Sequence, residues 1–409
     1  MKKADFYHHT LKCGIRIVFH PTRSDVCYLG LMMNTGTRDE QPGEPGMAHF
    51  VEHTIFKGTA SRTSKQIIDR IEGIGGELNA YTTKEETVLY ATVLTAYAHR
   101  AMDVMADMVQ HACFPEAEIC KELEVILDEI DSYKDAPAEL IYDEFESMLF
   151  RDHPLGTPIL GQPRALRRFK SDDARRFLAE RYNTDQMVLF VQGRLSMKQL
   201  IDWAEQCFAD TPLHVRDFRR TAPGIIAAEH KQAHHRHAQT HYLCGGHCYS
   251  LHHADRLGAF LLNNIMGGPS MNSRLNMSLR ERNGLVYTVE GAYTPLTDTG
   301  FWTIYLGCDH HDLEHCVELL HKELRRIRER AVGTAALARY KRQLSSQQAI
   351  AAENQEGNIL SAAKSTLHFG RVETTQEAMQ VIDRITPADL MRLANEMYDA
   401  SQMSSIIFQ

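Results

Sequence analysis

A polar segment that contains prolines divides this 409-residue chain into two halves of similar size. Residues 210–229 carry many charges and show neither the apolar period of a helix nor that of a strand, which is typical of a connection between domains. The length also favours more than one domain, because a single hydrophobic core rarely extends over so many residues. We therefore expect an N-terminal domain over 1–212, a linker over 213–229 and a C-terminal domain over 230–409.

The two halves show the same order of predicted elements, with strands first, then helices, then a last strand. In the first half, the patterns predict strands over 14–19, 27–33 and 187–191 and helices over 64–74, 97–111, 116–134 and 172–181. In the second half, they predict strands over 240–249 and 301–307 and helices over 254–266, 311–331 and 334–356. This order favours an α+β fold built from a duplicated unit, although the halves share little direct identity.

Composition narrows the class of protein. The 43% hydrophobic and 24% charged residues are those of a globular protein, and the net charge of −8 disfavours nucleic acid as a partner. No apolar run approaches the ~18 residues of a membrane span, and the N-terminus lacks the apolar region of a signal peptide. Nine scattered cysteines, an odd number, indicate reduced thiols and hence a cytoplasmic protein.

The segment His49-Phe50-Val51-Glu52-His53 carries the clearest chemical signal. Prolines and glycines before it and Gly58 after it predict a short helix over 47–57. On a helix, His49 and His53 lie about 40° apart around the axis, and Glu52 lies on the flank of the same face. Two neutral imidazoles there can hold Zn²⁺ while the carboxylate reaches a bound water. The order H-x-x-E-H is the inverse of the commoner zinc motif H-E-x-x-H.

A catalytic zinc ion takes three protein ligands and leaves a position for water, so a third ligand must come from another element. The predicted helix over 116–134 is the best donor, since Pro115 suits its first turn and Pro137 its end. Acidic residues at the margin of its apolar stripe need a partner. Spacing alone does not choose between Glu122, Glu124 and Glu129.

These motifs, taken with others along the chain, resemble the pitrilysin/insulinase family of zinc peptidases, and in particular its bacterial processing-peptidase-like members. The resemblance covers nearly the whole chain. In the first half, the matching segments are 46–59 around the histidines, 75–82, 128–130 in the acidic helix, 135–137 after it, and 153–161. In the second half, they are 273–275 and 279–287.

The resemblance implies roles for the residues at the predicted metal site. His49, His53 and Glu129 would bind one Zn²⁺ per chain, and Glu52 would be the general base of the reaction. Glu122 would not bind the metal itself but would support the residues that do.

The resemblance also implies contacts with substrate. Asn79 and Ala80 match a segment that pairs, as an edge strand, with an extended peptide through main-chain hydrogen bonds. Arg280 and Tyr287 match a pair that reaches the active site from the second half and stabilises the developing oxyanion.

For the architecture, the resemblance implies two homologous α/β-roll domains per chain. Four such rolls form a clam-shell around an inner chamber in the family, so this chain is expected to dimerise. Both motifs lie in one chain, which favours a homodimer over a heterodimer with a related subunit. The expected function is that of a zinc-dependent metalloendopeptidase acting on oligopeptides or unfolded segments. The alternative is a non-catalytic peptide-binding or assembly subunit of a heteromeric peptidase.

Further His and Cys residues gather within 230–253 and 308–316. His235, His237 and His241 would share one face of a predicted strand. None of these residues has the paired spacing of a structural zinc site, so we expect no second metal site.

Overall fold

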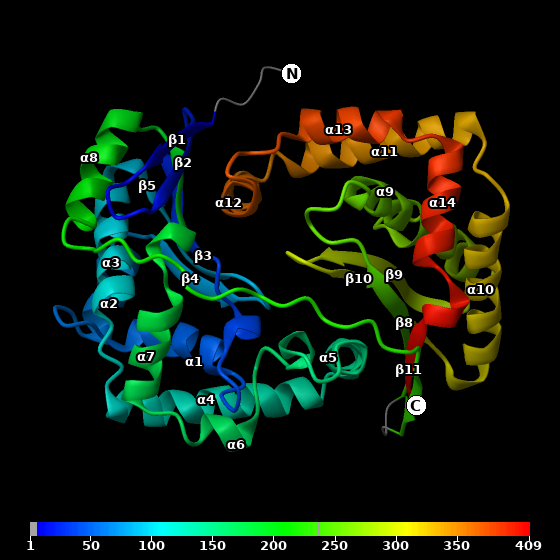
Figure 1. The fold of residues 1–409 in the computed structure, drawn as a ribbon, viewed down its shortest axis with the longest axis horizontal. Helices are drawn as coiled ribbons and strands as arrows, with labels where there is room; N and C mark the ends of the chain where they lie inside the picture. The colour runs from blue at the N-terminus through cyan, green and yellow to red at the C-terminus, as the bar shows by residue number, and fades with distance from the viewer. Residues whose placement is uncertain (1–5, 235–237) are drawn as a thin grey trace. The chain divides into compact units, whose positions relative to one another are not determined.

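The computed structural model of this chain describes residues 6–234 and 238–409. It contains two compact units, each built around one mixed sheet with helices against it (Figure 1). The first unit comprises the described residues of 1–130, 157–219 and 351–374, and the second those of 131–156, 220–350 and 375–409. Among the described residues, no helix is long and apolar enough to cross a membrane.

The sheet of the first unit has six strands in the order β1-β2-β6-β3-β5-β4. Its strands are β1 (Tyr7–Thr10), β2 (Arg16–Pro21), β3 (Val26–Met33), β4 (Glu77–Thr82), β5 (Thr87–Leu94) and β6 (Met187–Gly193). The helices of this unit are α1 (Met47–Thr54), α2 (Ser64–Glu72), α3 (Ala98–His111), α4 (Glu116–Lys134), α6 (Pro163–Leu166), α7 (Ser171–Arg181), α8 (Met197–Cys207) and α12 (Gln355–Phe369). The last residues of α4, from Asp131 on, belong to the second unit.

The sheet of the second unit has five strands in the order β7-β11-β8-β10-β9. Its strands are β7 (His230–Ala233), β8 (Thr240–Cys248), β9 (Val286–Pro295), β10 (Gly300–Cys308) and β11 (Ser404–Phe408). The helices are α5 (Pro137–Leu149), α9 (Arg256–Gly267), α10 (Leu313–Glu329), α11 (Thr334–Ala351), α13 (Thr375–Arg384) and α14 (Pro387–Met397), with a π-helical turn over Asn276–Glu281.

The two sheets share one topology. In the first, β2 pairs in parallel with β6, and β6, β3, β5 and β4 follow as antiparallel neighbours. In the second, β7 pairs in parallel with β11, and β8, β10 and β9 follow in the same antiparallel order. The expected α+β fold with a duplicated unit is therefore confirmed.

One helix in each unit comes from the opposite half of the chain. Helix α12 buries Ile359, Ala363 and Leu367 on the sheet of the first unit, where they contact a cluster that includes Val18 and Phe190. In the second unit, α5 buries Ile141 and Phe145 against strands β8, β10 and β11. Each sheet is thereby covered on both faces, which explains its long runs of buried residues.

Most of the predicted elements agree with the structure within a few residues, but the single helix expected over 334–356 is wrong. Helix α11 ends at Ala351, and the Asn354 side chain accepts a hydrogen bond of 3.1 Å from the amide of Gly357, which caps the start of α12. The chain turns at this cap because α12 leaves the second unit and packs in the first.

Candidate metal centre

Helix α1 sets two imidazoles one turn apart. The ring centroids of His49 and His53 are 4.5 Å apart with an angle of 70° between the ring planes. Phe50 and Val51, both fully buried, fix the opposite side of the helix in the core of the first unit. Rotation of this helix would expose both apolar side chains, so the direction of the imidazoles is set by the core.

The start of α1 depends on a close approach of two glycines and on one carboxylate. Gly46 has φ of 97°, and a Cβ atom there would lie 2.8 Å from the Cα of Gly161. Glu40 is partly buried and accepts hydrogen bonds of 3.0 and 2.9 Å from the amides of Gly46 and Ala48. These bonds satisfy amides at the helix start that have no partner within the helix. Burial raises the pKa of Glu40 to about 8.

A carboxylate from α4 meets both imidazoles. The Oε2 atom of Glu129 lies 3.7 Å from Nε2 of His49 and 3.4 Å from Nε2 of His53. One ligand atom from each of the three residues lies within 4.8 Å of the others. The structure thus brings these three predicted residues together at one point on the first unit.

A second carboxylate of α4 determines which nitrogen of His53 is available. Glu122 Oε1 lies 3.0 Å from Nδ1 of His53, and its Oε2 pairs with Nζ of Lys57 at 2.6 Å. An ionised carboxylate only accepts hydrogen bonds, so Nδ1 carries the proton and the lone pair of a neutral His53 is on Nε2. That lone pair faces Glu129.

The arrangement fits a bound cation better than a hydrogen-bonded cluster. Burial and the charge of His53 lower the pKa of His49 to about 3, so His49 is neutral near pH 7. When both imidazoles present the lone pair of Nε2, these nitrogens and the Glu129 carboxylate are all acceptors and repel one another unless a cation lies among them. Two imidazole nitrogens and one carboxylate oxygen are a ligand set that suits Zn²⁺ and leaves one coordination position open.

Glu52 follows His49 by three residues on α1 and is partly buried. Burial raises the pKa of its carboxyl above the usual range. A carboxylate with a raised pKa takes up a proton more readily, which is the property of a general base.

Asn79 and Ala80 lie on β4, the edge strand of the first sheet, opposite Tyr90 and Leu89 of β5. Helix α1 packs beside this strand. Among the described residues, the other side of β4 pairs with no strand, so its main-chain groups are open to an added strand.

Arg280 and Tyr287 belong to the second unit, and the structure does not bring them together with the histidines inside one unit. Arg280 is exposed at the end of the π-helical turn. Tyr287 is 58% exposed, and its hydroxyl donates a hydrogen bond of 3.2 Å to Asp309. This bond raises the pKa of the phenol.

Sequence reasoning missed two residues at this site, Lys57 and Glu40. Lys57 follows His53 by four residues, a spacing that could have suggested a charge partner near the motif. Glu40 lies seven residues before the first residue of the helix, outside the spacing of local caps, and the sequence gives no signal for it.

Other groups of His, Cys and acidic residues are scattered. His235 and His237 lie outside the described residues, and His241 forms a hydrogen bond of 2.8 Å with the hydroxyl of Tyr305. A group that sequence reasoning did not single out, formed by Asp309, His311 and Asp312, has ligand atoms within 4.8 Å of one another. All nine cysteines are free thiols.

Comparisons with known proteins show which family this chain belongs to. Residues 16–163 match the family model described as insulinase (peptidase family M16), and residues 168–344 match the one described as the peptidase M16 inactive domain. An uncharacterized zinc protease of Rickettsia bellii is 34% identical over 99% of this chain and 98% of its own. Subunit beta of the mitochondrial-processing peptidase of Saccharomyces cerevisiae is 26% identical over 90% of this chain and 83% of its own.

A solved structure has the same fold. The crystal structure of a protease from Helicobacter pylori matches with a TM-score of 0.91 and covers 100% of both chains at 18% identity. The resemblance to the pitrilysin/insulinase family that the motifs indicated is confirmed by the two family models and the relatives. This chain belongs to the insulinase family, peptidase family M16.

Proposed function

We propose that this chain is a zinc-dependent metalloendopeptidase that hydrolyses peptide bonds in oligopeptides or unfolded segments. The observation that carries the proposal is the convergence of His49, His53 and Glu129 from two helices, with Glu52 on the same helix as the histidines. A role in peptide hydrolysis is also supported by the names of the relatives, several of which are zinc proteases.

In this proposal, His49, His53 and Glu129 hold one Zn²⁺ per chain. Zinc bound by such a set acts as a Lewis acid and makes water acidic enough to ionise near neutral pH. Glu52 takes a proton from the attacking water and later delivers it to the leaving amine. The raised pKa of its carboxyl supports this role. Glu122 holds the ring of His53 through Nδ1.

The substrate would bind to β4 as an added strand. Main-chain groups near Asn79 and Ala80 would pair with the peptide backbone, which gives affinity with little dependence on sequence. Arg280 and Tyr287 would donate hydrogen bonds to the negative charge that develops on the scissile carbonyl oxygen.

The chain would act as a homodimer. It carries both the zinc motif and the Arg280/Tyr287 pair, so a dimer of identical chains would need no other subunit. One relative is named as a subunit of a peptidase, which makes a heterodimer the alternative. Native mass spectrometry of the purified chain separates these assemblies. The cytoplasmic location expected from the cysteines stays a prediction.

Digestion of a mixed peptide library, analysed by mass spectrometry, tests the activity with three proteins that contain equal amounts of zinc: wild type, Glu52→Gln and Glu72→Gln. Glu72 is exposed at the end of α2 and serves as the matched control. We expect internal cuts by wild type and Glu72→Gln, and a loss of about 10²–10⁴-fold in rate for Glu52→Gln. Inert wild-type protein with one zinc per chain would favour the non-catalytic subunit instead.

A further inference from the structure

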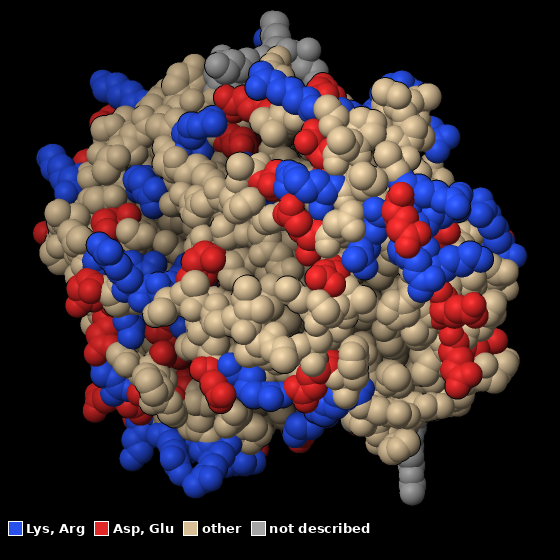
Figure 2. Space-filling model, turned by 45° about the vertical axis from the view of Figure 1, so that its right-hand side comes forward, with Lys and Arg blue, Asp and Glu red and all other residues tan. Residues whose placement is uncertain are grey.

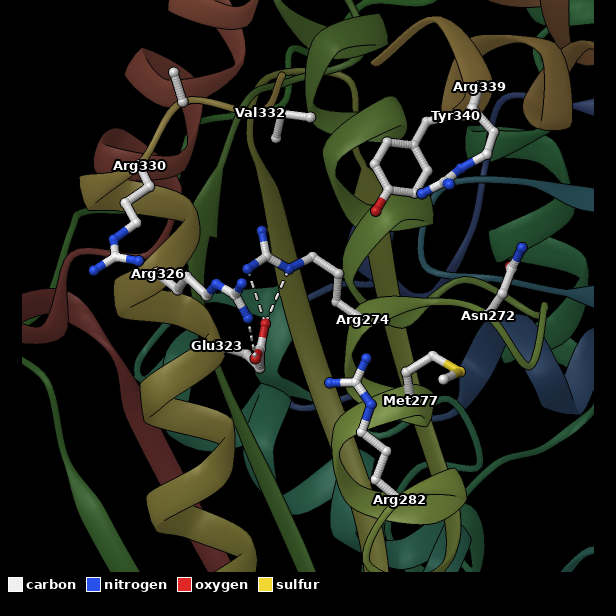
Figure 3. A pocket seen from close by; sticks show the side chains of 11 residues that line it. Asn272, Arg274, Met277, Arg282, Glu323, Arg326, Arg330, Val332, Arg339 and Tyr340 are labelled. Atoms are coloured by element: carbon white, nitrogen blue, oxygen red, sulfur yellow. Dashed lines mark hydrogen bonds and ion pairs between the residues drawn. The ribbon is translucent and has the colours of Figure 1, made fainter. Parts of the chain in front are cut away.

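A pocket of about 610 Å³ lies in the second unit, and its lining includes none of the residues of the candidate metal centre (Figure 3). Its lining comes from α10 and the loop after it, from the start of α11, and from the segment around the π-helical turn. A volume of this size is within the range of small-molecule sites.

The charges in this pocket are opposite in sign to those of the whole chain. The chain has a net charge of −8, yet the pocket is lined by one carboxylate, Glu323, and by five arginines: Arg274, Arg282, Arg326, Arg330 and Arg339. Five arginines against one glutamate leave four positive charges. Figure 2 shows Lys and Arg side chains gathered at the right-hand side of the view, with acidic side chains among them. A concave surface of one sign of charge raises the local concentration of small ions of the other sign.

The single carboxylate pairs with two of the guanidinium groups. Glu323 is buried, and its Oε2 accepts hydrogen bonds of 3.0 and 2.8 Å from Arg274, while Arg326 lies 3.5 Å from its Oε1 (Figure 3). Arg274 is itself only 16% exposed. Arg274 is therefore held in place by two contacts with Glu323, whereas Arg326 is 55% exposed and makes one longer contact.

Arg282 and Arg339 differ from this pair in their partners. Among the residues that the structure describes, neither Arg282 nor Arg339 forms an ion pair with a carboxylate. Figure 3 shows both guanidinium groups extending towards the middle of the pocket from different sides, next to Tyr340 and Met277. Like charges at close range repel one another, so an anion that enters the pocket relieves this repulsion.

We propose that this pocket binds a small polyanion that carries two or more phosphate groups. Arginine offers several N–H donors in a planar fork, which matches the oxygens of phosphate in pairs. Several guanidinium groups from different elements suit a ligand with several linked phosphates better than a ligand with one carboxylate. Linked phosphates could come from inorganic polyphosphate or from a nucleotide. The Arg339 guanidinium lies 5.4 Å from the centroid of the Tyr340 ring, so a base that stacks on this ring would lie beside Arg339.

Isothermal titration calorimetry with inorganic triphosphate and with ATP tests the proposal on the full-length, zinc-loaded chain. The test variant is Arg282→Gln/Arg339→Gln, which leaves the Glu323 pair intact. The matched control, Arg325→Gln/Arg342→Gln, removes the same charge from exposed positions of α10 and α11 that do not line the pocket. Circular dichroism confirms that both variants fold.

We expect one triphosphate per chain, bound at least about tenfold more weakly by the test variant than by wild type, with the control unchanged. Binding should also weaken as NaCl is raised from about 50 to about 500 mM. If ATP binds more tightly than triphosphate and Tyr340→Leu removes the difference, the source is a nucleotide. If ATP binds no more tightly, the source is polyphosphate.

Three results would overturn the proposal. The first is no binding of triphosphate or ATP at millimolar concentration. The second is an equal loss of affinity in the test and control variants, which would mean that anions respond to net charge alone. The third is tighter binding of a Glu-rich peptide than of triphosphate, which would assign the pocket to acidic protein segments.

Discussion

Nδ1 of His53 and Oε1 of Glu122 lie 3.0 Å apart, and the second oxygen of the same carboxylate is paired with Lys57. The carboxylate thus connects a predicted metal ligand to a fixed cation and orients the ring that would bind zinc. A carboxylate behind an imidazole also makes that imidazole a better donor to the metal.

We therefore expect Glu122→Gln to lower the affinity for zinc by about 10–100-fold, because the neutral amide orients and polarises His53 less well. Competition with a fluorescent chelator measures this affinity. Glu118→Gln is the control, since Glu118 lies on the same helix and pairs with exposed Lys121. Equal affinities of wild type and Glu122→Gln would contradict a role for this carboxylate at the metal.

Removal of the metal should destabilise the first unit. A ligand present at 100 times its dissociation constant adds about 2.7 kcal/mol to the stability of the state that binds it. We expect a chelator to lower the melting temperature of wild type. The melting temperature of His53→Ala should be the same with and without the chelator. A drop of the same size in His53→Ala would place the stabilising metal elsewhere.

Glu86 links α12 to the first sheet and gives a prediction for pH. Burial opposes its charge, but a hydrogen bond of 2.7 Å from His368 and an ion pair of 3.0 Å with Lys364 lower its pKa from 4.5 to about 2. A lowered pKa stabilises the folded state above the pKa of the unfolded state. That stability, about 3 kcal/mol, is lost as the pH falls from about 4.5 to about 2.

Acid titration of stability checks this prediction. Wild type should lose more free energy of unfolding between pH 4.5 and about 2 than Glu86→Gln, in which the group does not titrate. Glu353→Gln, at an exposed position before α12, should follow wild type. The same slope in all three proteins would rule out Glu86 as the source.

The sequence predicted the parts of this molecule that depend on local pattern. The helix bounds at 116–134 agree with α4 because Pro115 and Pro137 enclose a regular apolar stripe. Spacing could not choose Glu129 over Glu124, because the choice depends on where α4 crosses α1, which is a tertiary contact. The sequence also could not predict that α5 and α12 each pack on the sheet formed by the other half of the chain, since an apolar helix face does not indicate which sheet it covers.

The packing of α12 on the first sheet gives the last prediction. Ile359 is fully buried in the cluster with Val18, Val188 and Phe190, so Ile359→Ala leaves a cavity and should cost about 2–5 kcal/mol. Because α12 packs in the first unit, hydrogen exchange should become faster in β2 and β6 and stay unchanged in β8 and β10. Ile350→Ala, at a side chain that is 73% exposed, should change stability by less than about 0.5 kcal/mol. Faster exchange in β8 and β10 instead would mean that α12 supports the half of the chain from which it comes, contrary to the packing described above.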